Sequence, residues 1–342
     1  MTRRIVVDAL QVPSQLTGVG RQVQAIGAAL ADAPPEIELE LRCTAEAVAL
    51  LAPSFPARTD VRAVLRRSTP RLRRIVHQQL VAPFRERPGT VLVCPGDQAP
   101  LFGRTRRLLV VNDVRRLTAP GSSPPLEALW YRLIVPAAAR RAHRVLTVSR
   151  FSAGAIRDAL GIDAVVVAAH PPPAVEVALP GGGGFALVVG ALRAYKGIET
   201  AVEGARLAGL PLVLAGPDEG RASALRAEGV EVTGWVPEER LDALYRDAAV
   251  VVAPSTYEGY GLPVAESLAR GRPTVASDIP PHRELGGEAV LYFPPGDADA
   301  LAGRLREAVA RPAELAAAAL DRSRELAAQR PGWAEAILAA AQ

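Results

Sequence analysis

Short apolar runs rich in β-branched residues alternate with helical patterns along the whole chain of 342 residues. Continuous apolar strands that alternate with helices are typical of parallel sheets covered on both faces. The pattern therefore predicts an α/β protein with two doubly wound, Rossmann-like parallel sheets. In the second half the predicted strands are 185–189, 211–215, 229–233, 249–253, 273–277 and 289–293. In the first half they are 4–10, 37–43, 91–94, 108–112, 145–149 and 164–168.

Proline and glycine separate the two predicted sheets. His-Pro-Pro-Pro at 170–173 is followed after a short spacer by Pro180 and four glycines, a stretch that favours neither helix nor strand. We therefore predict an N-terminal domain over 1–172, a C-terminal domain over 173–325, and a final helix at 326–342 that packs back on the first domain. Ligands of such sheets bind at the carboxyl ends of the strands, so we expect a cleft between the two domains.

The two halves of the chain differ in charge. Residues 1–175 contain 24 Arg against 13 acidic residues, whereas the remainder contains 16 basic against 23 acidic residues. This asymmetry indicates different partners for the two domains. Arg62–Arg87 is the densest basic stretch, and its apolar residues at helical spacing predict an amphipathic helix. Two interpretations stay open for that helix: a solvated face, or contact with an anionic membrane surface.

Composition excludes several classes of protein. No apolar run approaches the roughly 18 residues of a spanning helix, and the start has no long apolar secretion signal. We expect a cytoplasmic protein, with peripheral contact at the inner face of the membrane as an option. Aromatic residues make up 4% of the chain and do not interleave with the basic stretch, so nucleic acid is not an expected partner.

Metal and cofactor sites are also not expected. Cys43 and Cys94 are too few for a disulfide framework or a zinc site and are predicted to be small core residues. The four histidines lack metal-ligand spacing and are predicted to be structural or exposed. Asp297 and Asp299 follow Pro-Pro-Gly and open a helical pattern, which favours a helix cap over a metal motif.

A block at 249–269 predicts a buried strand, a glycine-bearing loop and a helix. Glu258 and Glu266 stand eight positions apart on the two sides of this turn, and Pro263 fits the first turn of the helix. Backbone N–H groups of residues 259–262 at such a helix start can bind an anion. The block therefore suits a sugar diphosphate.

Lys196 is the one lysine in a chain whose other basic residues are arginines. It follows a predicted strand in Val-Val-Gly-Ala-Leu-Arg-Ala-Tyr-Lys-Gly at 188–197. An ammonium group is a compact point charge, unlike the planar fork of arginine. The residue is therefore a candidate ligand for phosphate, and an ordinary surface lysine is the other interpretation.

Eight short motifs follow one another along the chain. They are Thr-Gly-Val-Gly-Arg at 17–21, Asn-Asp at 112–113, Val-Ser-Arg-Phe-Ser at 148–152, Lys-Gly at 196–197, Leu-Ala-Gly-Pro at 214–217, Gly-Trp-Val-Pro at 234–237, Glu-x7-Glu at 258–266 and Ser-Asp-Ile-Pro-Pro-His-Arg-Glu at 277–284. Most of them are weak singly, but in this order and spacing they resemble the motifs of retaining family 4 glycosyltransferases of the GT-B fold, over nearly the whole chain.

The resemblance implies roles for individual residues of the C-terminal domain. Glu258 corresponds to the carboxylate that contacts the donor sugar near the reacting carbon, and Glu266 to the one that holds the ribose hydroxyls. Lys196 matches the family lysine that neutralises the diphosphate. The family arginine commonly follows the glycine at position 190 directly, where this chain has Ala191, so Arg193 is the displaced candidate. The donor is implied to meet the backbone of Gly190, Gly259, Tyr260, Gly261 and Leu262.

Three positions of the N-terminal domain are implicated in the same way. Gly18 and Gly20 fit the loop after the first strand that approaches the phosphates. A dinucleotide fingerprint needs a third glycine at position 23, where this chain has Val23, so NAD binding is disfavoured. Asn112 stands where family members often carry a histidine near the donor sugar, and an amide cannot titrate near neutral pH.

The implied reaction moves a sugar from a nucleoside diphosphate to an acceptor hydroxyl with retained anomeric configuration and without a metal or other cofactor. GDP-mannose is the preferred donor and UDP-glucose the next. The implied acceptor is a saccharide, a lipid-linked saccharide or a small metabolite. Two alternatives stay open: a nucleotide-sugar 2-epimerase, which needs no acceptor, and a non-catalytic sugar-nucleotide-binding subunit.

Overall fold

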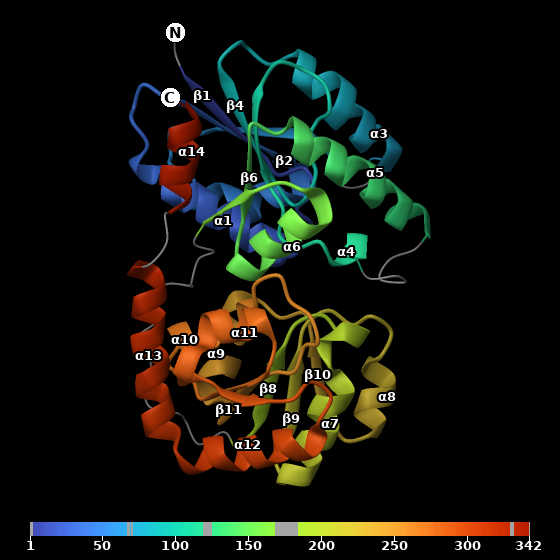
Figure 1. The fold of residues 1–342 in the computed structure, drawn as a ribbon, viewed down its shortest axis with the longest axis vertical. Coiled ribbons are helices and arrows are strands. Elements are labelled where there is room, and N and C mark those ends of the chain that lie inside the picture. The colour runs from blue at the N-terminus through green and yellow to red at the C-terminus, as the bar shows by residue number, and fades with distance from the viewer. Residues whose placement is uncertain are drawn as a thin grey trace. The chain divides into compact units, whose positions relative to one another are not determined.

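The chain folds into two compact units, each built on its own parallel sheet (Figure 1). The computed structural model describes residues 3–66, 69, 71–118, 125–167, 184–328 and 332–341. Unit 1 comprises Met1–His170 with Arg330–Gln342, and unit 2 comprises Pro171–Gln329. Of the proline- and glycine-rich stretch predicted to link the domains, only Gly184 lies among the described residues.

Unit 1 contains a seven-stranded parallel sheet in the order β3-β2-β1-β4-β5-β6-β7. Its central strands are apolar and buried on both faces, as in the core of unit 1 around Leu92, Leu109 and Val145. The strands are β1 (Arg4–Asp8), β2 (Glu38–Thr44), β3 (Asp60–Leu65), β4 (Thr90–Pro95), β5 (Arg106–Val110), β6 (Arg144–Thr147) and β7 (Ala164–Val166).

The prediction of six strands in this half was wrong, because it missed β3. This strand lies at the edge of the sheet and pairs only with β2. None of its residues is fully buried, and the charged residues Asp60 and Arg62 leave only a short apolar run at 63–65. An edge strand half open to water does not produce the signal by which a buried parallel strand is predicted.

Helices cover the sheet of unit 1 and include the last element of the chain. Trp333 and Ile337 of α14 are buried, and α14 packs against α1, β4 and β5. The helices are α1 (Gly18–Ala29), α2 (Val48–Leu51), α3 (Arg71–Val76), α4 (Arg115–Thr118), α5 (Pro125–Arg141), α6 (Arg150–Leu160) and α14 (Trp333–Ala341). A π-helical turn at His77–Val81 and a 3-10 turn at Ala82–Phe84 continue α3.

Helix α6 is capped by Ser149, whose side chain accepts a hydrogen bond from the N–H of Ser152. The motif Val-Ser-Arg-Phe-Ser offers two serines, of which the first is the cap. Ser152 lies three residues inside the cap, and its hydroxyl donates to the carbonyl of Asn112 at 2.9 Å. The second serine therefore helps to hold the loop after β5.

Unit 2 contains a six-stranded parallel sheet in the order β10-β9-β8-β11-β12-β13. All six predicted strands are present, each shifted by one or two residues at its start. The strands are β8 (Ala186–Val189), β9 (Leu212–Ala215), β10 (Glu231–Gly234), β11 (Val250–Ala253), β12 (Thr274–Ser277) and β13 (Leu291–Phe293).

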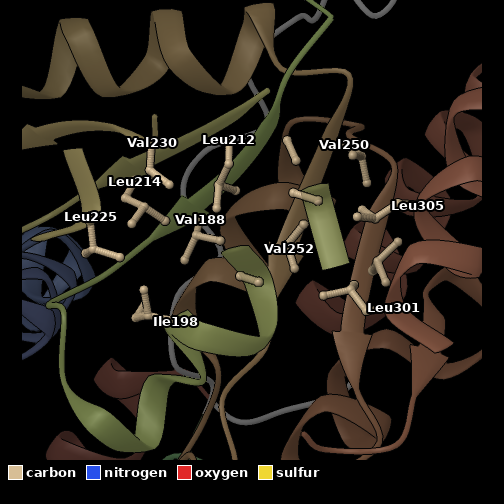
Figure 2. Close-up of a cluster of buried hydrophobic side chains, with 14 of the residues drawn as sticks. Val188, Ile198, Leu212, Leu214, Leu225, Val230, Val250, Val252, Leu301 and Leu305 are labelled. Atoms are coloured by element: carbon tan, nitrogen blue, oxygen red, sulfur yellow. The ribbon is translucent and has the colours of Figure 1, made fainter. Parts of the chain in front are cut away.

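The core of unit 2 joins this sheet to its covering helices (Figure 2). Val188 of β8 and Val252 of β11 lie with Ile198 of α7 and with Leu301 and Leu305 of α12. The helices are α7 (Ile198–Ala208), α8 (Ala222–Ala227), α9 (Glu238–Asp247), α10 (Leu262–Ala269), α11 (Pro280–Gly286), α12 (Ala298–Ala310) and α13 (Pro312–Ala328). Asp297 caps α12 by accepting from the N–H of Ala300, which confirms the prediction of a helix cap there.

The strand order of unit 2 reverses between β8 and β11. From β8 the chain adds β9 and then β10 on one side, and it returns to place β11 on the other side. In open α/β sheets, ligands bind at the carboxyl ends of the strands at such a reversal. The loops that follow β8 and β11 therefore occupy the position where a ligand is expected.

Candidate functional site

Two loops meet at the carboxyl edge of unit 2, one after β8 and one after β11. The N–H of Thr256 donates to the carbonyl of Tyr195 at 2.8 Å and ties the two loops together. Gly197 turns with φ +63°, and a Cβ at this position would lie 2.1 Å from the carbonyl oxygen of Pro254. Glycine is therefore required at position 197 both for the backbone conformation and for the close approach.

Lys196 and Glu258 form an ion pair between these loops. The Nζ atom of Lys196 lies 2.6 Å from Oε1 of Glu258, and the two side chains are 15% and 13% exposed. The hydroxyl of Ser255 donates to the same oxygen at 2.7 Å. Two protein donors therefore converge on Oε1 and fix the orientation of the carboxylate.

Both partners of this pair are charged at neutral pH. Burial raises the pKa of Glu258, but the ammonium group of Lys196 outweighs burial and leaves that pKa below its ordinary value. Burial lowers the pKa of Lys196, but the Glu258 carboxylate outweighs it and leaves that pKa above its ordinary value. The pair is a cation and an anion held in a partly dry environment, where Coulomb interactions are stronger than in water.

Glycines form the wall beside the pair. Gly190 has φ +142° and Gly216 has φ +156°, and a Cβ at position 216 would lie 2.0 Å from the carbonyl oxygen of Gly190. A pocket at this point is lined by Gly190, Lys196, Ser255 and Pro263, among others. A ligand can therefore approach backbone atoms directly beside the ammonium group.

Helix α10 begins at the same edge. Pro263 lies in its first turn, as predicted, and Gly261 precedes the helix with φ +101° and provides no side-chain cap. Helix starts of this kind orient N–H groups and a positive dipole end toward an anion. Tyr260 is buried, and Leu262 is the first helical residue, so the backbone of 259–262 has the predicted position at the helix start.

Glu266 lies further along α10 and is 4% exposed. Its Oε2 atom accepts a hydrogen bond from the hydroxyl of Tyr245 at 2.7 Å. Arg270 stacks on the ring of Tyr245 at 4.7 Å from its centroid. The second carboxylate of the Glu-x7-Glu motif is therefore anchored on α9, apart from the ion pair of the first.

Arg193 begins the turn that contains Lys196 but has a different partner. Its Nε atom lies 3.0 Å from Oε1 of Glu219, and its side chain is 46% exposed. The structure thus brings Lys196 and Glu258 together and leaves Arg193 at the surface beside an acidic residue. Its predicted contact with a diphosphate stays a prediction.

Asn112 lies in unit 1, after β5, and three hydrogen bonds hold it. Its N–H donates to Oδ1 of Asp97 at 2.8 Å, and its side-chain oxygen accepts from the amide of Gln22 at 2.8 Å. Its carbonyl accepts from Ser152. The residue is firmly positioned at the carboxyl edge of its own sheet.

Asp97, which accepts the hydrogen bond from Asn112, is unusual in its backbone conformation and in its pKa. The sequence did not predict it as a site residue. Among the described residues it is the one non-glycine with positive φ, at +67°. Its Oδ2 accepts from the hydroxyl of Tyr131. Burial, with a smaller contribution from Asp113, raises the pKa of Asp97 to about 6. A strained and partly neutral carboxyl group at a strand end is typical of a functional edge.

Gly18 and Gly20 lie in the first turn of α1 and not in a loop, so that part of the prediction was wrong. Thr17 caps the helix by accepting from the N–H of Gly20, and this cap starts the helix before the glycines. A Cβ at position 20 would lie 3.1 Å from Leu16 Cδ1. Gly20 therefore allows close packing between the helix start and the segment after β1.

His282 and Ser277 also belong to the site of unit 2 and were not singled out by sequence reasoning. Both side chains are fully buried. The hydroxyl of Ser277 donates to the carbonyl of Ser255, and Nδ1 of His282 lies 3.0 Å from the carbonyl oxygen of Ser277. The available signal was their place in the motif at 277–284, directly after a predicted strand.

Within the part of the chain that the structure describes, no His, Cys, Asp or Glu side chains form a group of three or more able to hold a metal ion. Over the same residues, every helix is too short or too polar to cross a membrane. Cys43 and Cys94 are free and buried, as predicted.

Comparison with known proteins shows what unit 2 is similar to. Residues 175–325, nearly the whole of unit 2, match the family model described as glycosyl transferases group 1. The chain is 31% identical over 140 residues to O-antigen chain mannosyltransferase B of Escherichia coli, a match that covers 37% of this chain and 37% of that protein. It is 24% identical over 202 residues to O-antigen chain mannosyltransferase RfbU of Salmonella typhimurium, covering 55% and 57% respectively.

Solved structures share the architecture of both units. Sucrose-phosphate synthase from Thermosynechococcus elongatus superposes with a TM-score of 0.68 at 18% identity, covering 98% of this chain and 96% of that one. HepE from Anabaena, in complex with UDP and glucose, gives a TM-score of 0.69 at 16% identity, covering 99% and 97%. The fold of the chain is therefore GT-B, as the resemblance implied.

Proposed function

We propose that the protein is a retaining glycosyltransferase that moves a sugar from a nucleoside diphosphate to an acceptor hydroxyl. The observation that carries the proposal is the ion pair of Lys196 and Glu258 beside a glycine wall and the start of α10. A cation, oriented N–H groups and a carboxylate are the groups needed where a diphosphate leaves a sugar. Their occurrence in a segment that matches glycosyl transferases group 1 supports the proposal.

Departure of the nucleoside diphosphate places negative charge on its outer phosphate and positive charge on the sugar ring. Lys196 and the N–H groups at the start of α10 stabilise the phosphate, and the Glu258 carboxylate stabilises the sugar cation. Arg193 leaves its ion pair with Glu219 and contacts the diphosphate instead. Glu266 holds the ribose. The acceptor attacks from the face that the phosphate leaves, and a phosphate oxygen takes the hydroxyl proton. Retention follows because the new bond forms on the same face as the old one.

We propose GDP-mannose as the donor and UDP-glucose as the next candidate. Mannosyltransferases among the curated relatives favour mannose, and HepE, solved with UDP and glucose, favours the second. The acceptor is a saccharide hydroxyl, free or lipid-linked. A thermal-shift panel of nucleotide sugars tests the donor, because a ligand at 100 times its Kd stabilises a protein by about 2.7 kcal/mol.

The decisive experiment incubates the full chain with GDP-mannose or UDP-glucose and follows release of the nucleoside diphosphate, with and without saccharide acceptors. Acceptor-dependent release supports transfer. Conversion of UDP-N-acetylglucosamine without any acceptor identifies a 2-epimerase instead. Binding without release or hydrolysis of any donor identifies a non-catalytic subunit and contradicts the proposal.

We also propose that unit 1 contacts an anionic membrane, a role for which the segment after β3 offers a specific apolar patch. Val76, Leu80, Phe84 and Phe102 are 42, 53, 66 and 50% exposed. The loop of Phe102 lies against the segment of Phe84, since a Cβ at Gly103 would lie 2.8 Å from Pro83. Exposed Arg73, Arg85 and Arg104 flank these residues.

Exposed apolar side chains among arginines are typical of surfaces that lie on anionic lipid. We expect the protein to sediment with vesicles containing phosphatidylglycerol and not with pure phosphatidylcholine vesicles. The double variant F84S/F102S should lose this binding, whereas V165S/V309S, which alters exposed valines elsewhere, should keep it. Equal sedimentation of both variants, or none by the wild type, contradicts the proposal.

A further inference from the structure

His282 lies between Ser277, at the end of β12, and Gly261, which precedes α10. Its imidazole is fully buried, and it lies in α11, directly after the loop that follows β12. One edge of the ring faces Ser277, with Nδ1 3.0 Å from the carbonyl oxygen and 3.1 Å from the hydroxyl. The other edge faces Gly261, because a Cβ at that glycine would lie 3.0 Å from Cδ2 and 3.5 Å from Nε2.

The Nδ1 edge leads to Glu258 through two serines. A carbonyl oxygen only accepts, so Nδ1 of His282 bears the hydrogen and donates it to the backbone carbonyl of Ser277. The hydroxyl of Ser277 donates to the backbone carbonyl of Ser255, and the hydroxyl of Ser255 donates to Glu258, so each residue fixes the position of the next. Both serines are buried, so water does not compete for these hydrogen bonds.

The opposite edge of the His282 ring, with Cδ2 and Nε2, packs against the backbone that precedes α10. Gly261, with φ +101°, rests on the ring and has no side chain to keep it at a distance. Nε2 is buried and has no hydrogen-bond partner among the described residues. In the neutral ring this atom bears a lone pair, which suits a position beside the positive end of the helix dipole.

We propose that His282 is a positioning residue for the donor site, with separate effects on the Glu258 carboxylate through Nδ1 and on the Gly261 backbone through the ring. The proposal rests on the proposed transfer reaction only for its kinetic consequences. The neutral imidazole performs both tasks. Burial lowers the pKa of His282 and outweighs the opposing attraction of Glu258, which keeps the ring neutral at physiological pH.

Two substitutions separate the two edges. Phe keeps a ring under Gly261 but removes the Nδ1 donor, whereas Asn keeps an N–H donor near Nδ1 but removes the far edge of the ring. We expect H282F to lower kcat about tenfold with KM for the donor nearly unchanged. The variant loses the Nδ1 hydrogen bond to Ser277, and the Glu258 carboxylate is then less well oriented. We expect H282N to raise KM for the donor about tenfold and to leave kcat within about threefold of the wild type.

A titration of Glu258 tests the Nδ1 edge without any turnover. In protein labelled with ¹³C at the glutamate carboxyl carbons, the signal absent from E258Q reports Glu258. Its pKa should rise in H282F and S277A, because the Ser255 donor is no longer held in line, and should stay unchanged in H282N. S267A is the matched control, since Ser267 is equally buried and its hydroxyl lies 2.7 Å from that of Thr274, away from Glu258.

Unequal kinetic effects of H282F and H282N, together with the predicted titrations, support the proposal. An unchanged Glu258 pKa in H282F, or equal losses of kcat and KM in both variants, overturns it. A wild-type protein that turns over no nucleotide sugar contradicts the transfer reaction alone. In that event the titrations still decide whether His282 positions Glu258.

Discussion

Lys196 Nζ and Glu258 Oε1 lie 2.6 Å apart, although 62 residues separate them in the chain. Each follows a buried strand, and the two strands are neighbours at the point where the sheet order reverses. The pair thus places opposite charges where the backbone also offers N–H groups to an anion. The first prediction follows from this arrangement.

Lys196→Ala and Glu258→Ala should each lower sugar transfer by about a hundredfold or more, because a preorganised charge contact in a transition state contributes roughly 3 kcal/mol. Initial rates of nucleoside diphosphate release measure the effect. Arg206→Ala, which removes an exposed arginine paired with Glu203, is the control and should keep wild-type rates. Near-normal turnover in either site variant, with folding verified by circular dichroism, would refute the assignment.

Gly197→Ala should destabilise unit 2 far more than Gly209→Ala. The two glycines have similar φ values of +63° and +72°, so the backbone strain of about 1 kcal/mol is common to both. A Cβ at position 209 meets open space, whereas at 197 it would lie 2.1 Å from the Pro254 carbonyl oxygen. Urea unfolding followed by amide exchange in β8 and β11 measures the difference, and equal stability of the two variants would contradict the close approach.

Asp97→Asn should stabilise unit 1 at neutral pH. Burial raises the pKa of Asp97 from 3.8 to about 6, so the neutral form is favoured on folding. The stability that this provides is present below pH 3.8 and is lost as the pH rises through about 6. Asn tolerates the positive φ and has no charge to bury. We expect a gain of about 3 kcal/mol at pH 7.5 that is mostly lost near pH 4, measured by amide exchange in β1 and β4.

A destabilising effect of Asp97→Asn that grows with pH would show that the ionised carboxylate is favoured in the fold. Asp113→Asn is a useful companion variant, since Asp113 also raises the pKa of Asp97. It should lower that pKa and leave the hydrogen bonds from Tyr131 and Asn112 in place.

Trp333→Ala should destabilise unit 1 by about 3 to 5 kcal/mol, the usual effect of truncating a large buried aromatic residue. Trp333 is 1% exposed and belongs to α14, which packs on α1 and β4. Hydrogen exchange should accelerate in α1 and stay unchanged in the strands of unit 2. Val309→Ala, at a half-exposed position of α12, should alter neither unit measurably.

Much of the fold was predictable because parallel strands buried on both faces leave a plain sequence pattern. Val250–Ala253 is such a strand, and its apolar run is bounded by a proline and a loop. That Glu258 and Lys196 lie at the same edge of the sheet was predictable because both follow strands of this kind. Edge strand β3 was not predictable from such a pattern, since it pairs with β2 on one side only and carries the charged residues Asp60 and Arg62.

Side-chain contacts between loops that are distant in the sequence were also not predictable. Ser255, Ser277 and His282 are residue types with many uses, and their connection depends on the ends of two strands, β11 and β12, that only the folded sheet brings together. The strained backbone of Asp97 likewise has no sequence signal, because Asp is common in turns of ordinary geometry. Gly18 and Gly20 are helical because Thr17 caps α1 ahead of them, whereas two glycines so close together favour a loop in the sequence.

The reversal of strand order in unit 2 also has a consequence for synthesis on the ribosome. Strand β8 emerges first and gains β9 and β10 on one side, but its other side stays unpaired until β11 has left the exit tunnel. During that interval an apolar strand with a bare hydrogen-bonding edge is open to pairing with other nascent chains. Arrival of Val250–Ala253 closes that edge of β8 and carries Glu258 to Lys196, so pairing of the two central strands and formation of the ion pair occur in the same event.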